Sequence, residues 1–97
     1  MYRSKKLLDH MRDCPHCMNC QQTNDQTIVG AHSNQLRDGK GRGLKASDYR
    51  VAALCYLCHM KLDQGHDMTK AERVEMWEEA HRKTVGWLFE SGRLIVK

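Results

Sequence analysis

Four cysteines arranged as two C-x-x-C pairs constrain this chain more than any other feature. The first pair is Cys17 and Cys20, and the second is Cys55 and Cys58. A two-residue gap lets both sulfurs of a pair face one metal ion, and four thiolates make the tetrahedral site that Zn²⁺ prefers. The sequence therefore predicts a structural zinc site that joins two distant segments of a small chain.

A fifth cysteine leaves the choice of the first two ligands open. Cys14 and Cys17 also have C-x-x-C spacing, and His16 lies between them. We favour Cys17 with Cys20, because Cys14 lies next to Pro15 and nearer the expected first helix. The alternative is that Cys14 replaces one of the two.

The cysteine count and residues 1–12 together indicate a cellular location. An odd number of five cysteines disfavours a closed disulfide framework. Residues 1–12 are polar and basic, without the apolar run of a signal peptide, and no stretch approaches the roughly 18 apolar residues that cross a bilayer. We expect reduced thiols and a cytoplasmic location.

The pattern of apolar residues predicts a single α+β domain over residues 1–97, with one modest core. Two short runs with β-branched or small apolar residues, 27–32 and 50–54, are expected to form the strands of a hairpin. Segment 33–47 contains three glycines among basic residues and is expected to be a loop.

Helices are expected on both sides of this hairpin. The first covers about 4–12, and the second begins at the second cysteine pair. The third and longest covers about 69–91, because Thr69 and Glu72 match a capping box and apolar residues follow at helical period. A short final strand is expected over 93–97.

The positive charge is concentrated in the central loop. The formal net charge is +4, which suits a polyanionic partner such as nucleic acid. The residues expected to face phosphates are Arg37, Lys40, Arg42 and Lys45. The alternative is a solvated loop that has no partner.

The order of knuckle, strand, loop, strand, knuckle and helix resembles the HNH, or ββα-metal, nuclease fold with a zinc-ribbon support. The resemblance covers about residues 14–65. It rests on the strand end Ala31-His32, the glycine-rich basic loop and the helix start Cys58-His59-x-x-x-Asp63. The layout is similar to the short YbcO-like nucleases of prophages. It implies a small zinc-stapled domain with a β-hairpin, a metal-binding helix and a long C-terminal helix.

This resemblance implies a metal-dependent endonuclease that hydrolyses phosphodiester bonds in DNA. His32 would be the general base, because a neutral imidazole can take a proton from an attacking water. His59 would hold a catalytic Mg²⁺ or Mn²⁺, supported by Asp63 one helical turn later. The alternative is that His59 caps the helix or competes for the zinc.

The resemblance also suggests partners. It implies DNA, duplex, branched or single-stranded, and a phage or host recombination protein in a bacterial cytoplasm. The expected role is phage or prophage DNA recombination or processing, and the chain is expected to be a monomer.

Two departures from the HNH pattern favour an alternative function. Many HNH enzymes have an acidic metal ligand just before the base, where this chain has Ala31, and the central Asn has only Asn34 or Asp48 as candidates. The metal would then depend on His59 with Asp63, Asp48 or water. The alternative is a non-catalytic zinc-binding adaptor for DNA or protein. Thiol redox chemistry ranks last, because no thioredoxin-like βαβ pattern surrounds either C-x-x-C pair.

Overall fold

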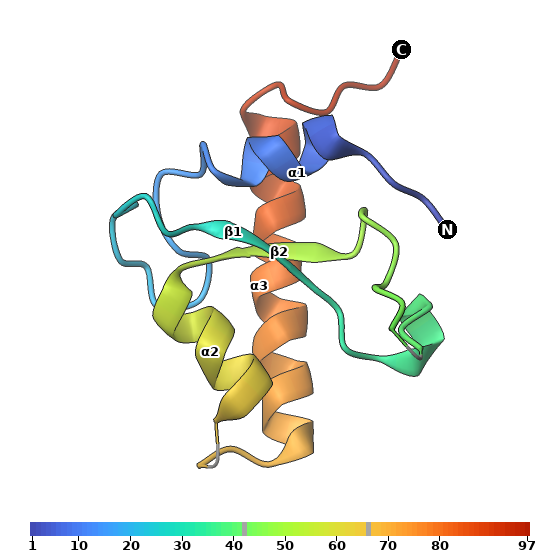
Figure 1. The fold of residues 1–97 in the computed structure, drawn as a ribbon. Helices are drawn as coiled ribbons and strands as arrows, with labels where there is room; N and C mark the ends of the chain where they lie inside the picture. Colours follow the sequence, from blue (N-terminus) through green and yellow to red (C-terminus); the bar gives the residue numbers. More distant parts are fainter. Residues whose placement is uncertain (42, 66) are drawn as a thin grey trace.

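The computed structural model describes residues 1–41, 43–65 and 67–97 and has an α+β architecture (Figure 1). The elements in chain order are α1 (Lys5–Met11), β1 (Val29–His32), the 3₁₀ helix η1 (Leu36–Asp38), β2 (Val51–Leu54), α2 (Tyr56–Gln64) and α3 (Lys70–Glu90). The expected hairpin and the three expected α-helices are confirmed. The loop between the strands contains the short helix η1, which the sequence did not predict.

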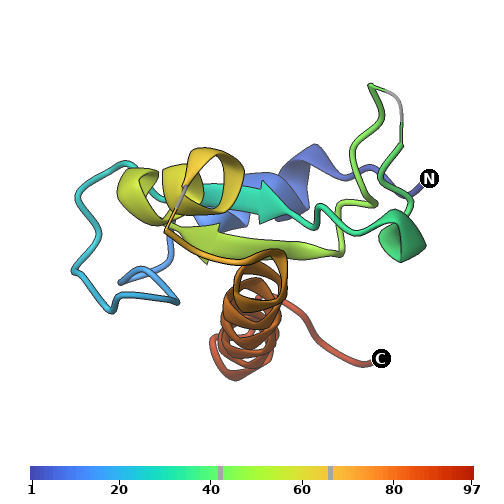
Figure 2. The ribbon, with the colours of Figure 1, turned by 90° about the horizontal axis from the view of Figure 1, so that it is seen from below.

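The hairpin forms the middle layer of the molecule. Strands β1 and β2 pair antiparallel, with Val29 opposite Leu54 and His32 opposite Val51. All four residues of β2 are buried. Helix α3 packs against β2 and α1 packs against β1. Figure 2 shows α3 on one side of the strands and α2 on the other.

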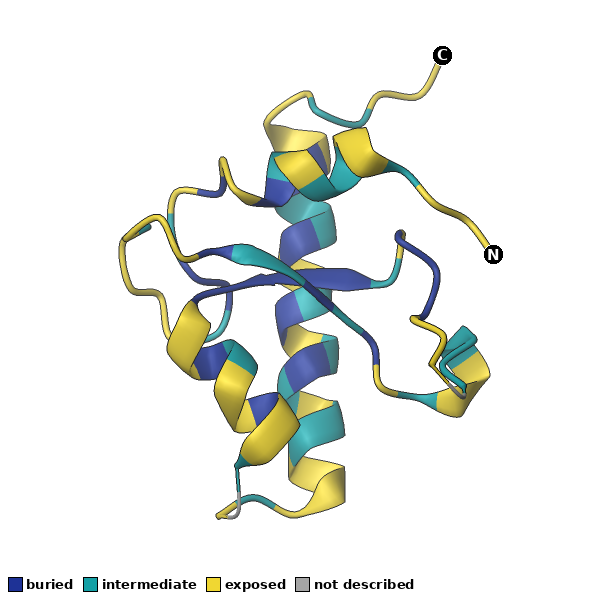
Figure 3. Cartoon of the chain, viewed as in Figure 1, coloured by how far each residue is buried: buried dark blue, intermediate teal, exposed yellow. Residues whose placement is uncertain are grey.

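The long helix α3 is fixed to the hairpin by two polar side chains. Trp77 Nε1 donates to the carbonyl of Ala31 in β1 at 2.9 Å. Thr84 Oγ1 accepts from the N–H of Ala53 in β2 at 3.0 Å and donates to a carbonyl of its own helix. The buried residues of α3 follow the helical period that the sequence predicted: Trp77, Ala80, Thr84 and Leu88. Figure 3 shows buried positions in dark blue along α3, where the helix crosses the hairpin.

Both ends of α3 are closed by local hydrogen bonds. The Thr69 hydroxyl accepts from the Glu72 N–H and the Glu72 carboxylate accepts from the Thr69 N–H, which confirms the capping box. At the other end, Gly92 has a φ of +77°, and the next two N–H groups both donate to the carbonyl of Leu88. The strand expected over 93–97 is wrong, because its first residues close the helix instead of pairing with the hairpin.

Helix α1 comes close to β1 at a glycine. A Cβ at Gly30 would lie 3.1 Å from the Cγ of Met11 and 3.4 Å from a methyl carbon of Leu8. A Cβ here would require the Met11 side chain to move by a few tenths of an ångström, so glycine suits this close approach. The Ser4 hydroxyl caps α1 by accepting from the Leu7 N–H.

Helix α2 is anchored by few residues. Cys58 and Leu62 are buried, whereas Tyr56 and Leu57 are more than half exposed. The helix therefore depends on its cysteines for its position. None of the described helices is long and apolar enough to cross a membrane.

Thr84 tests the link between α3 and the hairpin. Thr84→Val keeps the shape of the side chain but leaves the buried N–H of Ala53 without a partner, so we expect a loss of about 1–3 kcal/mol in the free energy of unfolding. Thr84→Ser keeps the hydroxyl and is the matched control. Chemical denaturation of zinc-loaded proteins measures both. A Val variant as stable as the Ser variant would contradict this role.

Candidate metal centre and active-site cleft

The four cysteines of the two C-x-x-C pairs are positioned to hold a metal ion. Their sulfur atoms all lie within 4.8 Å of one another, and the Cys20 and Cys55 sulfurs are 3.8 Å apart. A tetrahedron with metal–sulfur bonds of about 2.3 Å has edges of about 3.8 Å. The sulfur positions therefore fit one tetrahedral metal, and Zn²⁺ is consistent with them.

The first pair lies on a tight knuckle whose backbone points donors at sulfur. The Cys17 N–H donates to the Gln22 carbonyl at 2.9 Å, and Gln21 has a φ of +67°. The backbone N–H groups of Asn19 and Cys55 each lie 3.4 Å from the Cys17 sulfur. Hydrogen bonds of this kind orient metal ligands and stabilise their negative charge.

The thiols of the cluster titrate differently from free cysteine. Burial raises the pKa of the Cys17 thiol, but the N–H groups that point at its sulfur outweigh burial and lower the pKa to about 7. Burial raises the pKa of Cys58 to about 12, and the nearby Cys17 sulfur adds to this effect. A divalent cation would supply the positive charge that lets neighbouring thiolates ionise together.

Cys14 lies outside this cluster. It is fully buried, and its thiol donates to the carbonyl of His16 at 3.2 Å. Burial raises its pKa, so it keeps its proton. The structure thus gathers Cys17 and Cys20, rather than Cys14, with the second pair.

The three residues predicted to carry the chemistry line one cleft of about 400 Å³. His32 comes from the end of β1, whereas His59 and Asp63 come from α2, one turn apart. The two imidazoles are distant in sequence, and the hairpin with its cysteine-held ends brings them to the same cavity. Positive side chains also line the cleft, together with Asp9, which pairs with Lys5 at 2.9 Å; the cations are Lys5, Arg12, Lys40 and Lys45.

His59 and Asp63 lie next to each other on one side of the cleft. His59 Nε2 lies 3.3 Å from the Asp63 carboxylate, and the Asn34 amide donates to the other oxygen of Asp63 at 3.3 Å. Among the described residues, only the cysteine cluster brings together three or more side chains suited to a metal. A cation on His59 and Asp63 would therefore keep positions for water and for a phosphate oxygen, as Mg²⁺ sites commonly do.

On the opposite side of His32 is a buried carboxylate. His32 Nε2 lies 2.8 Å from an oxygen of Asp48, which is only 3% exposed. A carboxylate only accepts hydrogen bonds, so in a neutral imidazole this contact places the ring proton on Nε2 and leaves Nδ1 with a lone pair. Asp48 does not line the cleft. The structure thus places Asp48 against His32, and the alternative of Asp48 as a metal ligand stays a prediction.

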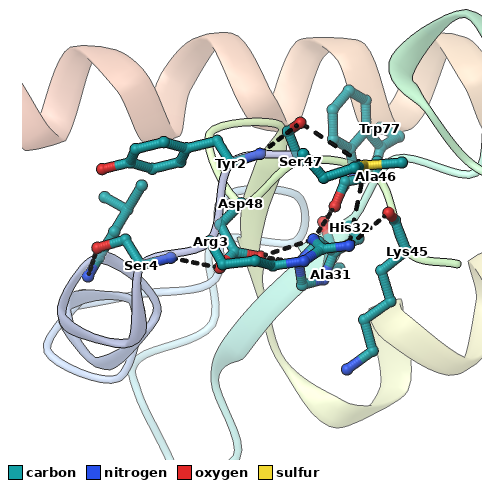
Figure 4. A network of polar contacts seen from close by, with 12 residues as sticks. Tyr2, Arg3, Ser4, Ala31, His32, Lys45, Ala46, Ser47, Asp48 and Trp77 are labelled. Carbon is teal, nitrogen blue, oxygen red and sulfur yellow. Dashed lines mark hydrogen bonds and ion pairs between the residues drawn. The ribbon is translucent and has the colours of Figure 1, made fainter.

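The N-terminal segment holds Asp48 in this position (Figure 4). The Ser4 N–H donates to Asp48 at 2.7 Å and the Arg3 guanidinium donates at 3.2 Å. Burial raises the pKa of Asp48, but the contacts with His32, Ser4 and Arg3 outweigh it and lower the pKa below the usual value. Asp48 is therefore an anion that orients His32.

Residues 1–4 run beside the loop that precedes β2. Arg3 donates to the carbonyls of Lys45 and Ala46, and the Asp48 N–H donates to the Tyr2 carbonyl. This pairing of the chain start with residues 45–48 has no periodic signal in the sequence.

The predicted phosphate-facing residues divide into groups. Lys40 and Lys45 line the cleft, whereas Arg37 lines a neighbouring cavity and pairs with Glu78 at 3.4 Å. Arg42 lies outside the described residues. The sequence prediction missed Lys5 and Arg12, which lie at the start and at the C-cap of α1 and also line the cleft. Their spacing of about two helical turns could have placed them on one face of the expected helix.

Function is inferred from the cleft and the cysteine cluster. No protein-family model, curated protein or solved structure matches the chain significantly.

The metal content of two cysteine variants tests the cluster. Cys20→Ser removes a sulfur of the cluster, so we expect less than one equivalent of tightly bound zinc and a cooperative unfolding transition that is weakened or lost. Cys14→Ser is the matched control and retains one equivalent. Atomic absorption and thermal denaturation measure both variants. Zinc loss in Cys14→Ser with retention in Cys20→Ser would overturn the assignment.

Proposed function

We propose that this protein is a metal-dependent endonuclease of the HNH, or ββα-metal, type that hydrolyses phosphodiester bonds in DNA. The observation that carries the proposal is the single cleft lined by His32, His59 and Asp63. A base, a cation-binding pair and four positive side chains in one cavity match the needs of phosphodiester hydrolysis. A role in phage or prophage DNA processing goes with the resemblance to YbcO-like nucleases.

In this proposal the four-cysteine site holds a structural Zn²⁺. Four sulfur ligands close the coordination sphere and leave no open position for a substrate, which is typical of structural zinc. The site therefore supplies stability, and the chemistry takes place in the cleft.

His32 is the general base of the proposed reaction. Its Nδ1 accepts a proton from a water molecule while Nε2 stays hydrogen-bonded to Asp48. The anionic Asp48 stabilises the imidazolium that results and keeps the ring in the productive tautomer. The oxygen of the water forms the new bond to phosphorus, and the bond from phosphorus to the 3′ oxygen breaks.

His59 and Asp63 would hold the divalent cation, Mg²⁺ or Mn²⁺, that the proposal requires. When bound, it would supply positive charge that stabilises the negative charge developing in phosphodiester hydrolysis. Asn34 keeps Asp63 oriented toward His59. Lys40 and Lys45 hold the DNA strand through its phosphates, which makes binding weaker as salt rises.

Cleavage of supercoiled plasmid by zinc-loaded protein tests the proposal. We expect nicking that requires added Mg²⁺ or Mn²⁺ and falls by about 10²–10⁴-fold in His32→Ala, the range that a general base contributes. Asp48→Asn can present an amide N–H to the imidazole and favour the wrong tautomer, so its rate falls at least about tenfold.

The control is His10→Ala, a histidine of α1 that does not line the cleft. Metal is omitted rather than chelated, because a chelator would also remove zinc. Equal nicking by wild type and His32→Ala would refute the role of His32. Salt-dependent DNA binding without metal-dependent cleavage of any DNA would favour the adaptor function instead.

A further inference from the structure

A second cavity, of about 660 Å³, lies between η1, the end of α2 and the start of α3. The proposed chemistry does not use it. Its volume falls within the roughly 300–1,000 Å³ of typical small-ligand sites. It is therefore large enough for one nucleoside.

The lining of this cavity combines apolar and positively charged side chains. Leu36, Leu62 and Val74 supply apolar surface, and the cations are Arg37, Lys70 and Arg73. No Asp or Glu is among the described residues that line it. This combination suits a flat heterocycle attached to a phosphate and disfavours a positively charged ligand.

Leu36 is the residue that the fold itself does not explain. It lies in η1 with 81% of its surface exposed, the most exposed large apolar side chain in the described chain apart from Val96 near the C-terminus. An unpaired base stacks on an apolar side chain or on a guanidinium plane. Leu36 and the neighbouring Arg37 offer both at the cavity.

Trp77 also lines the cavity, but its ring is already covered. His81 stacks on the indole with ring centroids 4.9 Å apart, and the Arg50 guanidinium lies 4.7 Å from the ring centre. Arg50 is in turn fixed by Asp38 and Glu78. The indole therefore acts as part of the core, and a bound base would pack on Leu36 and Val74.

Asn34 connects this cavity to the cleft, because it lines both. It follows β1 two residues after His32, and its amide contacts Asp63. A DNA strand whose scissile phosphate lies between His32 and His59 would pass Asn34. The next nucleotide along that strand would then reach the second cavity.

We propose that this cavity binds an unpaired base of the DNA strand, next to the phosphate that is cut. The proposal rests on the nuclease function above and specifies its substrate as DNA with an unpaired nucleotide, as in single strands, bulges and branch points. A base within a duplex must first leave the stack, at a cost of a few kcal/mol. Fully paired duplex is therefore the poorer substrate.

Fluorescence with 2-aminopurine tests this directly. The probes are two DNA duplexes that differ only in whether the 2-aminopurine is an unpaired bulge or fully paired. Binding is measured with zinc-loaded His32→Ala protein, so cleavage does not interfere. We expect the bulged probe to bind roughly tenfold more tightly, about 1.4 kcal/mol, with a change in 2-aminopurine emission. Leu36→Ser in the same background removes the preference.

The matched control is Leu44→Ser, which alters another exposed leucine of the same loop that does not line the cavity. It should keep the preference. Equal affinity for the two probes, or equal loss in the Leu36 and Leu44 variants, would overturn the base-binding proposal even if plasmid nicking depends on His32. Conversely, a preference that Leu36→Ser removes would support the cavity even if no DNA is cleaved.

Discussion

The convergence of four sulfur atoms at the open ends of the hairpin is the constraint on which the rest of the structure depends. One cysteine pair precedes β1 and the other follows β2. A two-stranded hairpin is marginal alone, and α2 buries few side chains of its own. Metal binding of this type contributes on the order of 10 kcal/mol in zinc-finger peptides. A metal there would fix both the hairpin and the start of α2, which carries His59.

The position of His32 depends on two further contacts. The pairing of β1 with β2 places it at the strand end, opposite Val51. The buried carboxylate of Asp48 then sets the orientation of the ring, and Ser4 and Arg3 hold that carboxylate. The surroundings of His32 are thus built partly from the chain start, whereas His59 and Asp63 come from α2 and contact Asn34. The hairpin and α2 together bring these side chains to one cavity.

The features predictable from sequence were those with local signals. Cysteine spacing identified the four sulfurs, the period of apolar residues identified α3, and Thr69 with Glu72 identified where α3 begins. The helix-start pattern around His59 and the strand end at His32 named the residues that meet in the cleft. The clamp of Asp48 by Ser4 and Arg3 could not be predicted, because it joins residues about 44 positions apart without a repeating pattern. The final strand was predicted wrongly, since Leu94 closes the helix end and packs against the core, whereas Ile95 and Val96 are exposed.

The most direct test of the account asks whether one divalent cation lies beside both histidines of the cleft. Mn²⁺ is added to zinc-loaded protein, and imidazole signals are followed by nuclear magnetic resonance, where paramagnetic broadening reports proximity to the ion. The account predicts that the His32 and His59 signals broaden at the lowest Mn²⁺ ratios. His81, which lies on α3, is bonded to the Val51 carbonyl and does not line the cleft, broadens less than either of them. Uniform broadening of all histidines, or none at His59, would contradict a cation site in this cleft.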